Sequence, residues 1–68
     1  MIRKAVKSSN IVSIGYDEDD GRLEVEFIRS GVYTYFDVPK KLYERALKAP
    51  SIGKFIWANI RDKYDFKN

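Results

Sequence analysis

The chain contains no cysteine and no histidine among its 68 residues. Without cysteine there can be no disulfide bond and no thiolate nucleophile, and structural zinc sites lose their usual ligand. Without histidine there is no imidazole base, and the most common metal ligand is also missing. We therefore expect no metal and no other cofactor. A chain of this length should form one domain, residues 1–68, which buries only about 60% of its unfolded surface.

Long apolar runs are also absent, because no stretch approaches the roughly 18 apolar residues of a membrane helix. The first residues lack the apolar segment of a signal peptide, so we expect a cytoplasmic protein without a membrane partner. The net charge of +3 is unevenly distributed: +3 over residues 1–10, −5 over 11–26 and +5 over 27–68. A mildly basic C-terminal part is compatible with a nucleic-acid partner.

Aromatic residues are abundant, with five tyrosines, four phenylalanines and one tryptophan. In so small a domain these rings should supply much of the core. Polar and apolar residues alternate in three segments, 10–16, 22–28 and 32–38, and this period of two residues is typical of β-strands. In the first strand we expect one face to carry Val12, Ile14 and Tyr16. Short turns rich in Asp, Ser and Gly separate the segments, which predicts an antiparallel meander.

The apolar period changes to that of a helix after Pro39, a residue favoured at the first helical position. The helical pattern stops at Ala49-Pro50, because the residue before a proline resists helical dihedral angles. Ser51 is a suitable N-cap for a second helix, whose apolar pattern continues to Tyr64.

These elements predict an α+β fold, in which a three-stranded antiparallel β-meander precedes two α-helices packed on one face of the sheet. The basic residues 1–9 are expected to form a loosely ordered lead-in. The tail, residues 65–68, has no assignment.

Several short motifs occur in a characteristic order along the chain. They are Ser8-Ser9-Asn10-Ile11, Ile14-Gly15-Tyr16, Leu23-x-Val25-x-Phe27, Tyr33-Thr34-Tyr35, Val38-Pro39, Tyr43, Ser51-x-Gly53-x-Phe55, Ile60-Arg61 and Tyr64. Together they span residues 8–64 and resemble the KTSC domain family, whose recognisable centre is the Tyr-x-Tyr pair. That family occurs at the C-terminus of some lysyl-tRNA synthetases and as small stand-alone bacterial and phage proteins. The resemblance implies a module of unassigned function for which RNA binding has been suggested. The chain departs from the family at Trp57, where a polar residue such as Asn is usual.

Tyr33 and Tyr35 lie two residues apart, so they share one face of their strand. They could form a base-stacking platform or belong to the core. A three-residue loop at 29–31 would pair Phe27 with Tyr33 and Val25 with Tyr35, which places both tyrosines on the core face under the helices. A two-residue loop would place them beside two glutamates, whose charge repels phosphate. We therefore favour the core interpretation.

The outward faces of the two predicted helices carry most of the C-terminal positive charge. Candidate nucleic-acid contacts on these faces are Lys40, Lys41, Arg45, Lys48, Lys54, Trp57, Arg61 and Lys63. Trp57 lies one helical turn from both Lys54 and Arg61, at the margin of the apolar stripe. An aromatic ring flanked by two cations could contact a nucleobase or a partner protein. The same arrangement is also typical of a tryptophan that covers the edge of the core, with the Lys and Arg stems packed over it.

No arrangement of residues predicts catalysis, because the serines have no histidine partner and no glycine-rich phosphate loop is present. The acidic run at 17–20 lacks the spacing of a calcium loop, and we interpret it as a solvated hairpin turn. We therefore predict a small non-catalytic binding module whose basic helix faces bind RNA. The alternative is a protein–protein interaction module that uses the Trp57 region or an exposed sheet edge.

Overall fold

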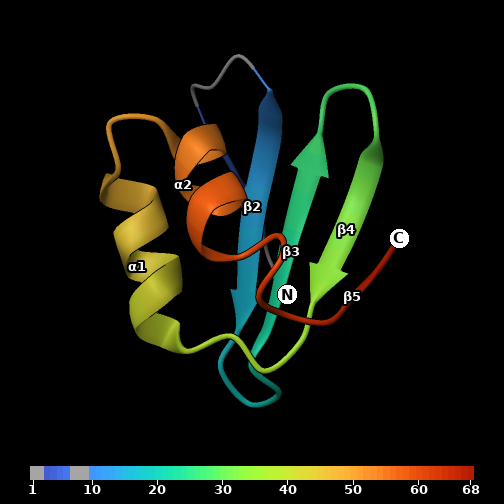
Figure 1. Cartoon of the computed structure of the whole chain (residues 1–68), viewed down its shortest axis with the longest axis vertical. Coiled ribbons are helices and arrows are strands. Elements are labelled where there is room, and N and C mark those ends of the chain that lie inside the picture. The colour runs from blue at the N-terminus through green and yellow to red at the C-terminus, as the bar shows by residue number, and fades with distance from the viewer. Residues whose placement is uncertain (1–2, 7–9) are drawn as a thin grey trace.

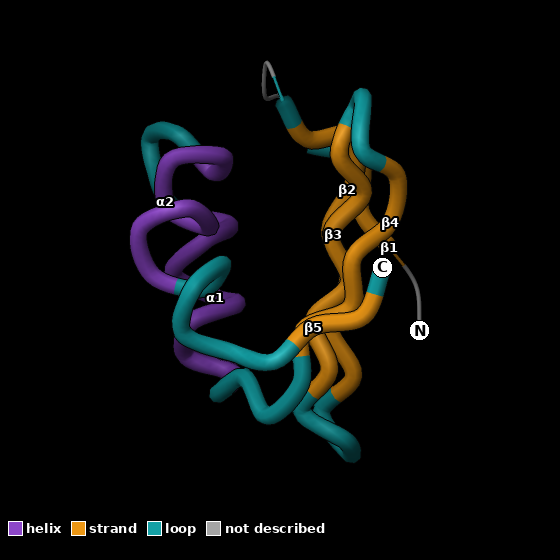
Figure 2. The backbone as a smooth tube through the Cα atoms, turned by 45° about the vertical axis from the view of Figure 1, so that its right-hand side comes forward, coloured by secondary structure: helices purple, strands orange, loops and turns teal. Residues whose placement is uncertain are grey.

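The computed structural model describes residues 3–6 and 10–68, which form a two-layer α+β fold (Figures 1 and 2). The elements in this part of the chain are β1 (Arg3–Ala5), β2 (Ile11–Asp17), β3 (Arg22–Phe27), β4 (Gly31–Tyr35), α1 (Lys40–Lys48), α2 (Ile52–Asn59) and β5 (Phe66–Lys67). The strands form one antiparallel sheet in the order β1-β2-β3-β4-β5. Both helices lie on the same face of this sheet (Figure 2). The α+β class and the central meander are confirmed.

The prediction of three strands is wrong, because a short strand is added at each edge of the meander. β1 pairs with β2, so Arg3–Ala5 is not a loose lead-in, and β5 pairs with β4, so the tail also belongs to the sheet. Every residue of these two strands is exposed, and they therefore show no apolar alternation. The rest of the expected lead-in, residues 1–2 and 7–9, lies outside the described residues.

Strand β2 contains a bulge that changes which side chains face the core. Ile11 and Ser13 pair with adjacent residues of β3, so Val12 is one extra residue in its strand. Ile11 is buried on the same face as Ile14, whereas Val12 is 42% exposed. The expectation that Val12 shares a face with Ile14 and Tyr16 is wrong for this reason.

The β3–β4 hairpin has a different register from the predicted one but keeps the predicted face. Val25 pairs with Tyr33, and the loop consists of residues 28–30. Gly31 was expected inside the loop, but it pairs with Phe27 as the first residue of β4 and has a φ of 83°. The register therefore differs by two residues. Because side chains alternate with a period of two, this shift leaves Tyr33 on the core side of the sheet.

Both helices begin close to their local signals, although Pro39, expected at the first helical position, is the extended N-cap of α1. α1 follows Pro39, and α2 follows Ser51, whose hydroxyl accepts a hydrogen bond from the Lys54 amide at 3.4 Å. α2 ends at Asn59, earlier than its apolar pattern suggested, and Arg61 follows in a turn. The second helix is therefore shorter than the sequence predicted.

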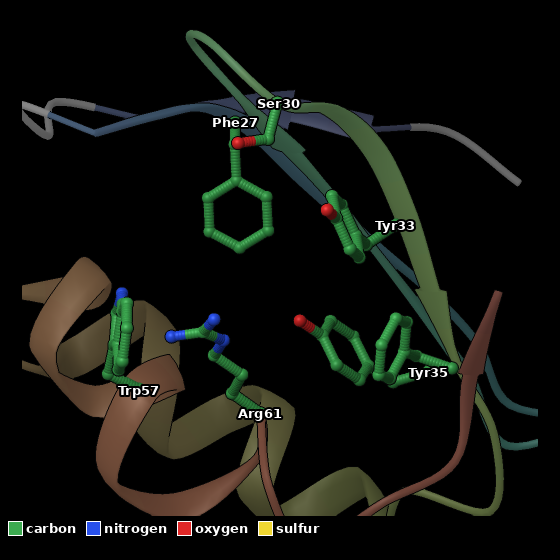
Figure 3. A pocket seen from close by; sticks show the side chains of 7 residues that line it. Phe27, Ser30, Tyr33, Tyr35, Trp57 and Arg61 are labelled. Atoms are coloured by element: carbon green, nitrogen blue, oxygen red, sulfur yellow. The ribbon is translucent and has the colours of Figure 1, made fainter. Parts of the chain in front are cut away.

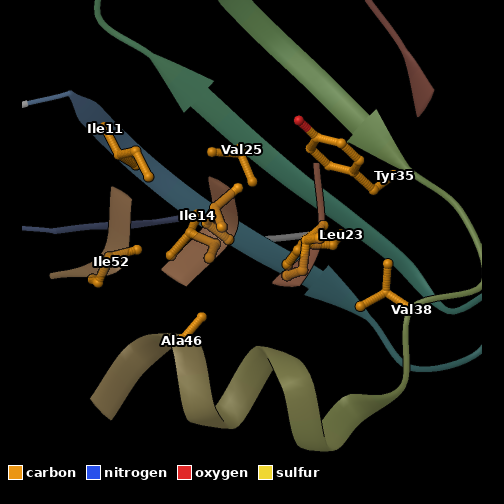
Figure 4. Close-up of a cluster of buried hydrophobic side chains, with 10 residues drawn as sticks. Ile11, Ile14, Leu23, Val25, Tyr35, Val38, Ala46 and Ile52 are labelled. Atoms are coloured by element: carbon orange, nitrogen blue, oxygen red, sulfur yellow. The ribbon is translucent and has the colours of Figure 1, made fainter. Parts of the chain in front are cut away.

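The core fills the space between the sheet and the helices (Figure 4). Its members are Ile11, Ile14, Leu23, Val25, Tyr35, Val38, Ala46, Ile52, Ile56 and Ile60. Five of these residues are isoleucines, and Tyr35 is the one aromatic member. The expectation that rings would supply much of the core is thus only partly met. Most rings instead pack around the core margin.

Candidate functional site: an aromatic pocket between α2 and the β3–β4 hairpin

Four rings form a continuous wall on the helix-facing side of the sheet, which we call the ring wall: Phe27, Tyr33, Tyr35 and Phe66. Tyr33 contacts Phe27 edge-on, with ring centres 5.4 Å apart at 88°, and lies 6.4 Å from Tyr35 at 20°. Phe66 lies 5.5 Å from Tyr33 and 5.8 Å from Tyr35. Edge-on and offset arrangements such as these are favourable for aromatic rings. The ring wall is therefore an ordered surface, anchored by Tyr35 at 1% exposure.

Trp57 and Arg61 form the opposite wall. Trp57 is on α2 and is 56% exposed. The chain leaves the helix at Ile60, and the Arg61 amide donates to the Ile56 carbonyl at 2.8 Å. This turn places the Arg61 guanidinium carbon 3.6 Å from the centre of the Trp57 ring. The pair is a cation–π contact in which a fixed positive charge faces the sheet (Figure 3).

A cavity of about 170 Å³ separates the two walls, and Ser30 completes its lining (Figure 3). The Tyr35 hydroxyl points across it toward Arg61 (Figure 3). Burial raises the pKa of Tyr35, and the nearby positive charge of Arg61 opposes that rise. At neutral pH the phenol is therefore a neutral hydrogen-bonding group beside a permanent cation.

The lining of this pocket contains no aspartate or glutamate. The two glutamates of β3 are on the other face of the sheet, since they alternate with the core residues. There they form ion pairs with Arg3, at 3.5 Å from Glu24 and 3.5 Å from Glu26. The pocket thus combines aromatic faces with an arginine and excludes carboxylates from its walls.

The structure brings together the tyrosine pair and the Trp57–Arg61 pair, which the sequence analysis treated as separate candidates. Tyr35 is part of the core, and Tyr33 is partly exposed on the pocket side. The helices were expected to cover both rings. Tyr35 is buried as expected, at 1% exposure, whereas Tyr33 stays partly exposed because α2 ends at Asn59 and α1 lies across the molecule from β4 (Figure 1).

The cations predicted on α1 are not brought to the pocket. Lys40 forms an ion pair with Glu18, and this hydrogen bond raises the pKa of Lys40. Lys41, Arg45 and Lys48 line a separate shallow depression of about 280 Å³ together with Glu44. The remaining candidates are exposed, with Lys54 in the first turn of α2 and Lys63 in the turn after it.

Three pocket residues were missed by the sequence analysis: Phe27, Ser30 and Phe66. Phe27 was assigned to the core, and Ser30 was considered only as a turn residue. Phe66 was in the unassigned tail, where its alternation with Tyr64 was the one available signal of a strand. That signal is too short to be distinctive.

The described residues contain no group of three or more acidic side chains that could hold a metal ion. Across the same part of the chain, no helix is both long and apolar enough to span a membrane.

Comparison with known proteins gives a consistent family match. The family model described as the KTSC domain matches residues 7–64. The crystal structure of a KTSC domain protein from Yersinia pestis superposes with a TM-score of 0.97 at 37% identity, covering 98% of this chain and 94% of that one. An uncharacterized protein of Stutzerimonas stutzeri is 41% identical over 54 residues, which is 79% of this chain and 76% of that protein. A protein of Tsukamurella paurometabola is 30% identical over 59 residues, covering 87% and 88% of the two chains.

Proposed function

The chain belongs to the KTSC domain family, and from this premise we propose that it is a non-catalytic module that binds single-stranded RNA at the aromatic pocket. One observation carries the proposal: the ring wall faces the Trp57–Arg61 pair across a cavity whose lining has no carboxylate. Unpaired bases are recognised by stacking on aromatic rings and on arginine, and duplex bases cannot reach such a site. An RNA partner also implies a compartment that contains RNA, so the cytoplasmic location expected from the sequence is part of the proposal.

The exposed rings supply the stacking surfaces. Trp57 and Phe66 are 56% and 53% exposed, on opposite sides of the cavity. Stacking of a base on an aromatic side chain contributes about 1–3 kcal/mol, and it tolerates different bases. Arg61 adds donors that suit a phosphate or a base edge. The expected ligand is therefore a short unpaired segment with little sequence preference.

The exposed cations of the helices act at longer range in this proposal. They are Lys41, Arg45, Lys48, Lys54 and Lys63, while Lys40 contributes less because Glu18 neutralises it. Charges at this distance raise the rate of encounter with a polyanion and make binding sensitive to salt. The basic helix faces predicted from the sequence thus assist binding, and the pocket holds the base.

A titration with a single-stranded RNA decamer tests this function, with the fluorescence of Trp57 as the readout because it is the chain's one tryptophan. We expect quenching that saturates, weakens as salt is raised and is much smaller with the matching duplex. Phe66→Ala should weaken binding at least fivefold, which corresponds to about 1 kcal/mol. Val12→Ala is the matched control, since Val12 is an exposed apolar residue of β2 outside the pocket. Absence of binding at low salt would overturn the proposal.

A second candidate function is protein–protein interaction, which the exposed apolar side chains at the rim of the pocket favour. Ile28 is 56% exposed and lines a hollow together with Trp57. Trp57 and Phe66, which are exposed to a similar degree, both line the aromatic pocket. Under this alternative, Trp57→Ala should abolish capture of a protein partner, whereas neutralising Lys41, Arg45 and Lys48 together should leave it intact. RNA binding predicts a loss of affinity in both variants.

A further inference from the structure

A second hollow adjoins the aromatic pocket and shares Trp57 with it. It measures about 270 Å³ and is lined by Asn10, Phe27, Ile28, Arg29, Ser30 and Trp57. Phe27, Ser30 and Trp57 also line the first pocket. The two hollows are therefore neighbouring parts of one groove, with these three residues as the divider between them.

Each part of this groove contains one arginine. Arg61 lines the first hollow, and Arg29, in the loop between β3 and β4, lines the second. Neither lining includes an aspartate or a glutamate. This charge pattern suits a ligand with negative charge at two points and apolar or aromatic groups between them. A nucleic-acid strand has that pattern, because a phosphate follows every base.

The size of each hollow also indicates a ligand in two parts. Volumes of about 170 and 270 Å³ are both smaller than the roughly 300 Å³ at which typical small-molecule pockets begin. Trp57 lines both, and more than half of it remains exposed despite its contact with Arg61. Ser30, on the divider, can donate a hydrogen bond to a phosphate that links two bases.

We propose that the groove binds two successive nucleotides of a single RNA strand, one in each hollow, with Arg61 and Arg29 at the two ends. This inference rests on the proposed function. It adds the number of nucleotides that the groove binds and the hollow that each one occupies. The base in the first hollow stacks on the ring wall. The base in the second hollow contacts Trp57 and Ile28, and the linking phosphate crosses the divider at Ser30.

Short oligonucleotides of increasing length test the proposal. The probes are adenosine monophosphate, the 5′-phosphorylated dinucleotide pApA, the dinucleotide pApAp phosphorylated at both ends, the trinucleotide and a decamer. Each is titrated against the whole chain with Trp57 fluorescence as the readout. We expect the affinity to rise about tenfold from one nucleotide to two, as one added stacking contact predicts, and to rise less at the third. Equal affinities for the monophosphate and the dinucleotide would overturn the inference.

Substitutions of the two arginines test which end of the groove each of them occupies. Arg29→Gln should weaken pApAp, which has a phosphate at each end, severalfold and leave adenosine monophosphate unchanged, whereas Arg61→Gln should weaken both. Lys4→Gln is the matched control, because it removes one positive charge from the exposed strand β1 outside both hollows. If Arg29→Gln weakens both ligands equally, the two-part assignment is wrong.

The outcomes separate this inference from the proposed function. If the decamer binds but affinity increases evenly with every added nucleotide, RNA binding stands and the two-part groove falls. If no RNA binds, the proposed function fails and the inference fails with it. If the dipeptide Asp-Phe quenches Trp57 as strongly as pApA does at the same concentration, the groove is a peptide site and the nucleotide assignment is overturned.

Discussion

The guanidinium carbon of Arg61 lies over the indole of Trp57, 3.6 Å from the ring centre. The two residues are four positions apart, one at the end of α2 and one in the turn that follows it. The contact places a positive charge against the ring of an exposed tryptophan. It also holds a long, flexible side chain in one place, which reduces the entropy that a ligand must remove when it binds.

Removing this contact should have a small effect on stability and a larger effect on the tryptophan signal. Replacing Arg61 with methionine keeps an unbranched apolar stem but removes the charge, and should lower the free energy of unfolding by about 0.5–1 kcal/mol, as for exposed cation–π pairs. Denaturant titration measures the loss, and the fluorescence of folded Trp57 should change with it. Arg61→Lys retains the charge and should lose less. A loss above about 2 kcal/mol in the methionine variant would show that Arg61 supports the core directly.

The C-terminal strand should matter more for ligand binding than for folding. β5 forms two register pairs with β4, and Phe66 is 53% exposed, so Phe66→Ala should cost no more than about 1–1.5 kcal/mol of stability. The same change should weaken RNA binding at least fivefold, since it removes one ring from the ring wall. Lys67→Ala, in the same strand, controls for general weakening of β5. Equal effects of both substitutions on RNA affinity would argue against a direct role for the ring.

Asp37 connects β4 to α1 with a φ of 58°, a left-handed conformation that side chains with a Cβ atom rarely adopt. Asp37→Gly should therefore be more stable than Asp37→Ala by about 1 kcal/mol. At an ordinary helical position the order is reversed, and the same two substitutions at Lys41 in α1 provide the comparison. Thermal unfolding of the four variants checks this. If alanine is the better residue at both positions, the left-handed conformation of Asp37 is not present in solution.

Tyr35 should titrate above the ordinary tyrosine pKa of 10.0, because burial disfavours its charged form. The unfolded chain then loses this proton at lower pH than the folded chain does. Stability should therefore fall as pH rises from about 10.0 toward the folded pKa of Tyr35. The Cζ chemical shifts of labelled tyrosines, followed by NMR and assigned with Tyr35→Phe, measure the pKa directly.

The neighbouring arginine provides a second test of the same group. Arg61 lowers the pKa of Tyr35, so Arg61→Gln should raise it further. No change, or a downward change, would show that Arg61 does not face the Tyr35 phenol in solution.

Features with a local signal were predictable from the sequence. Pro39 and Ser51 mark the helix starts, because capping and proline effects act within a few residues. The proximity of Trp57 and Arg61 was predicted from helical spacing, and the turn after α2 preserves it although the helix ends at Asn59. The turn at Gly31 was recognised, but its exact pairing partner was not, since two registers of the hairpin place the same side chains on the same face.

Features that depend on distant pairing were not predictable. β1 and β5 bury no side chain, so only their partners in β2 and β4 define them as strands. The residues around Val12 give no sequence signal of the bulge. The pocket itself depends on how far α2 extends over the sheet, which is a relation between two layers. Trp57, Arg61 and the two tyrosines were therefore identified from the sequence. Phe27 and Phe66 were not recognised as pocket residues, and it was not predicted that the two walls face each other.

The core and the pocket are almost separate sets of residues: among the described residues, Tyr35 alone belongs to both. Substitutions at the other pocket positions can thus alter recognition while the isoleucine-rich core continues to hold the fold. Related chains with the same backbone are free to differ at this surface. If this surface binds RNA as proposed, its specificity can therefore change by substitutions that leave the fold stable.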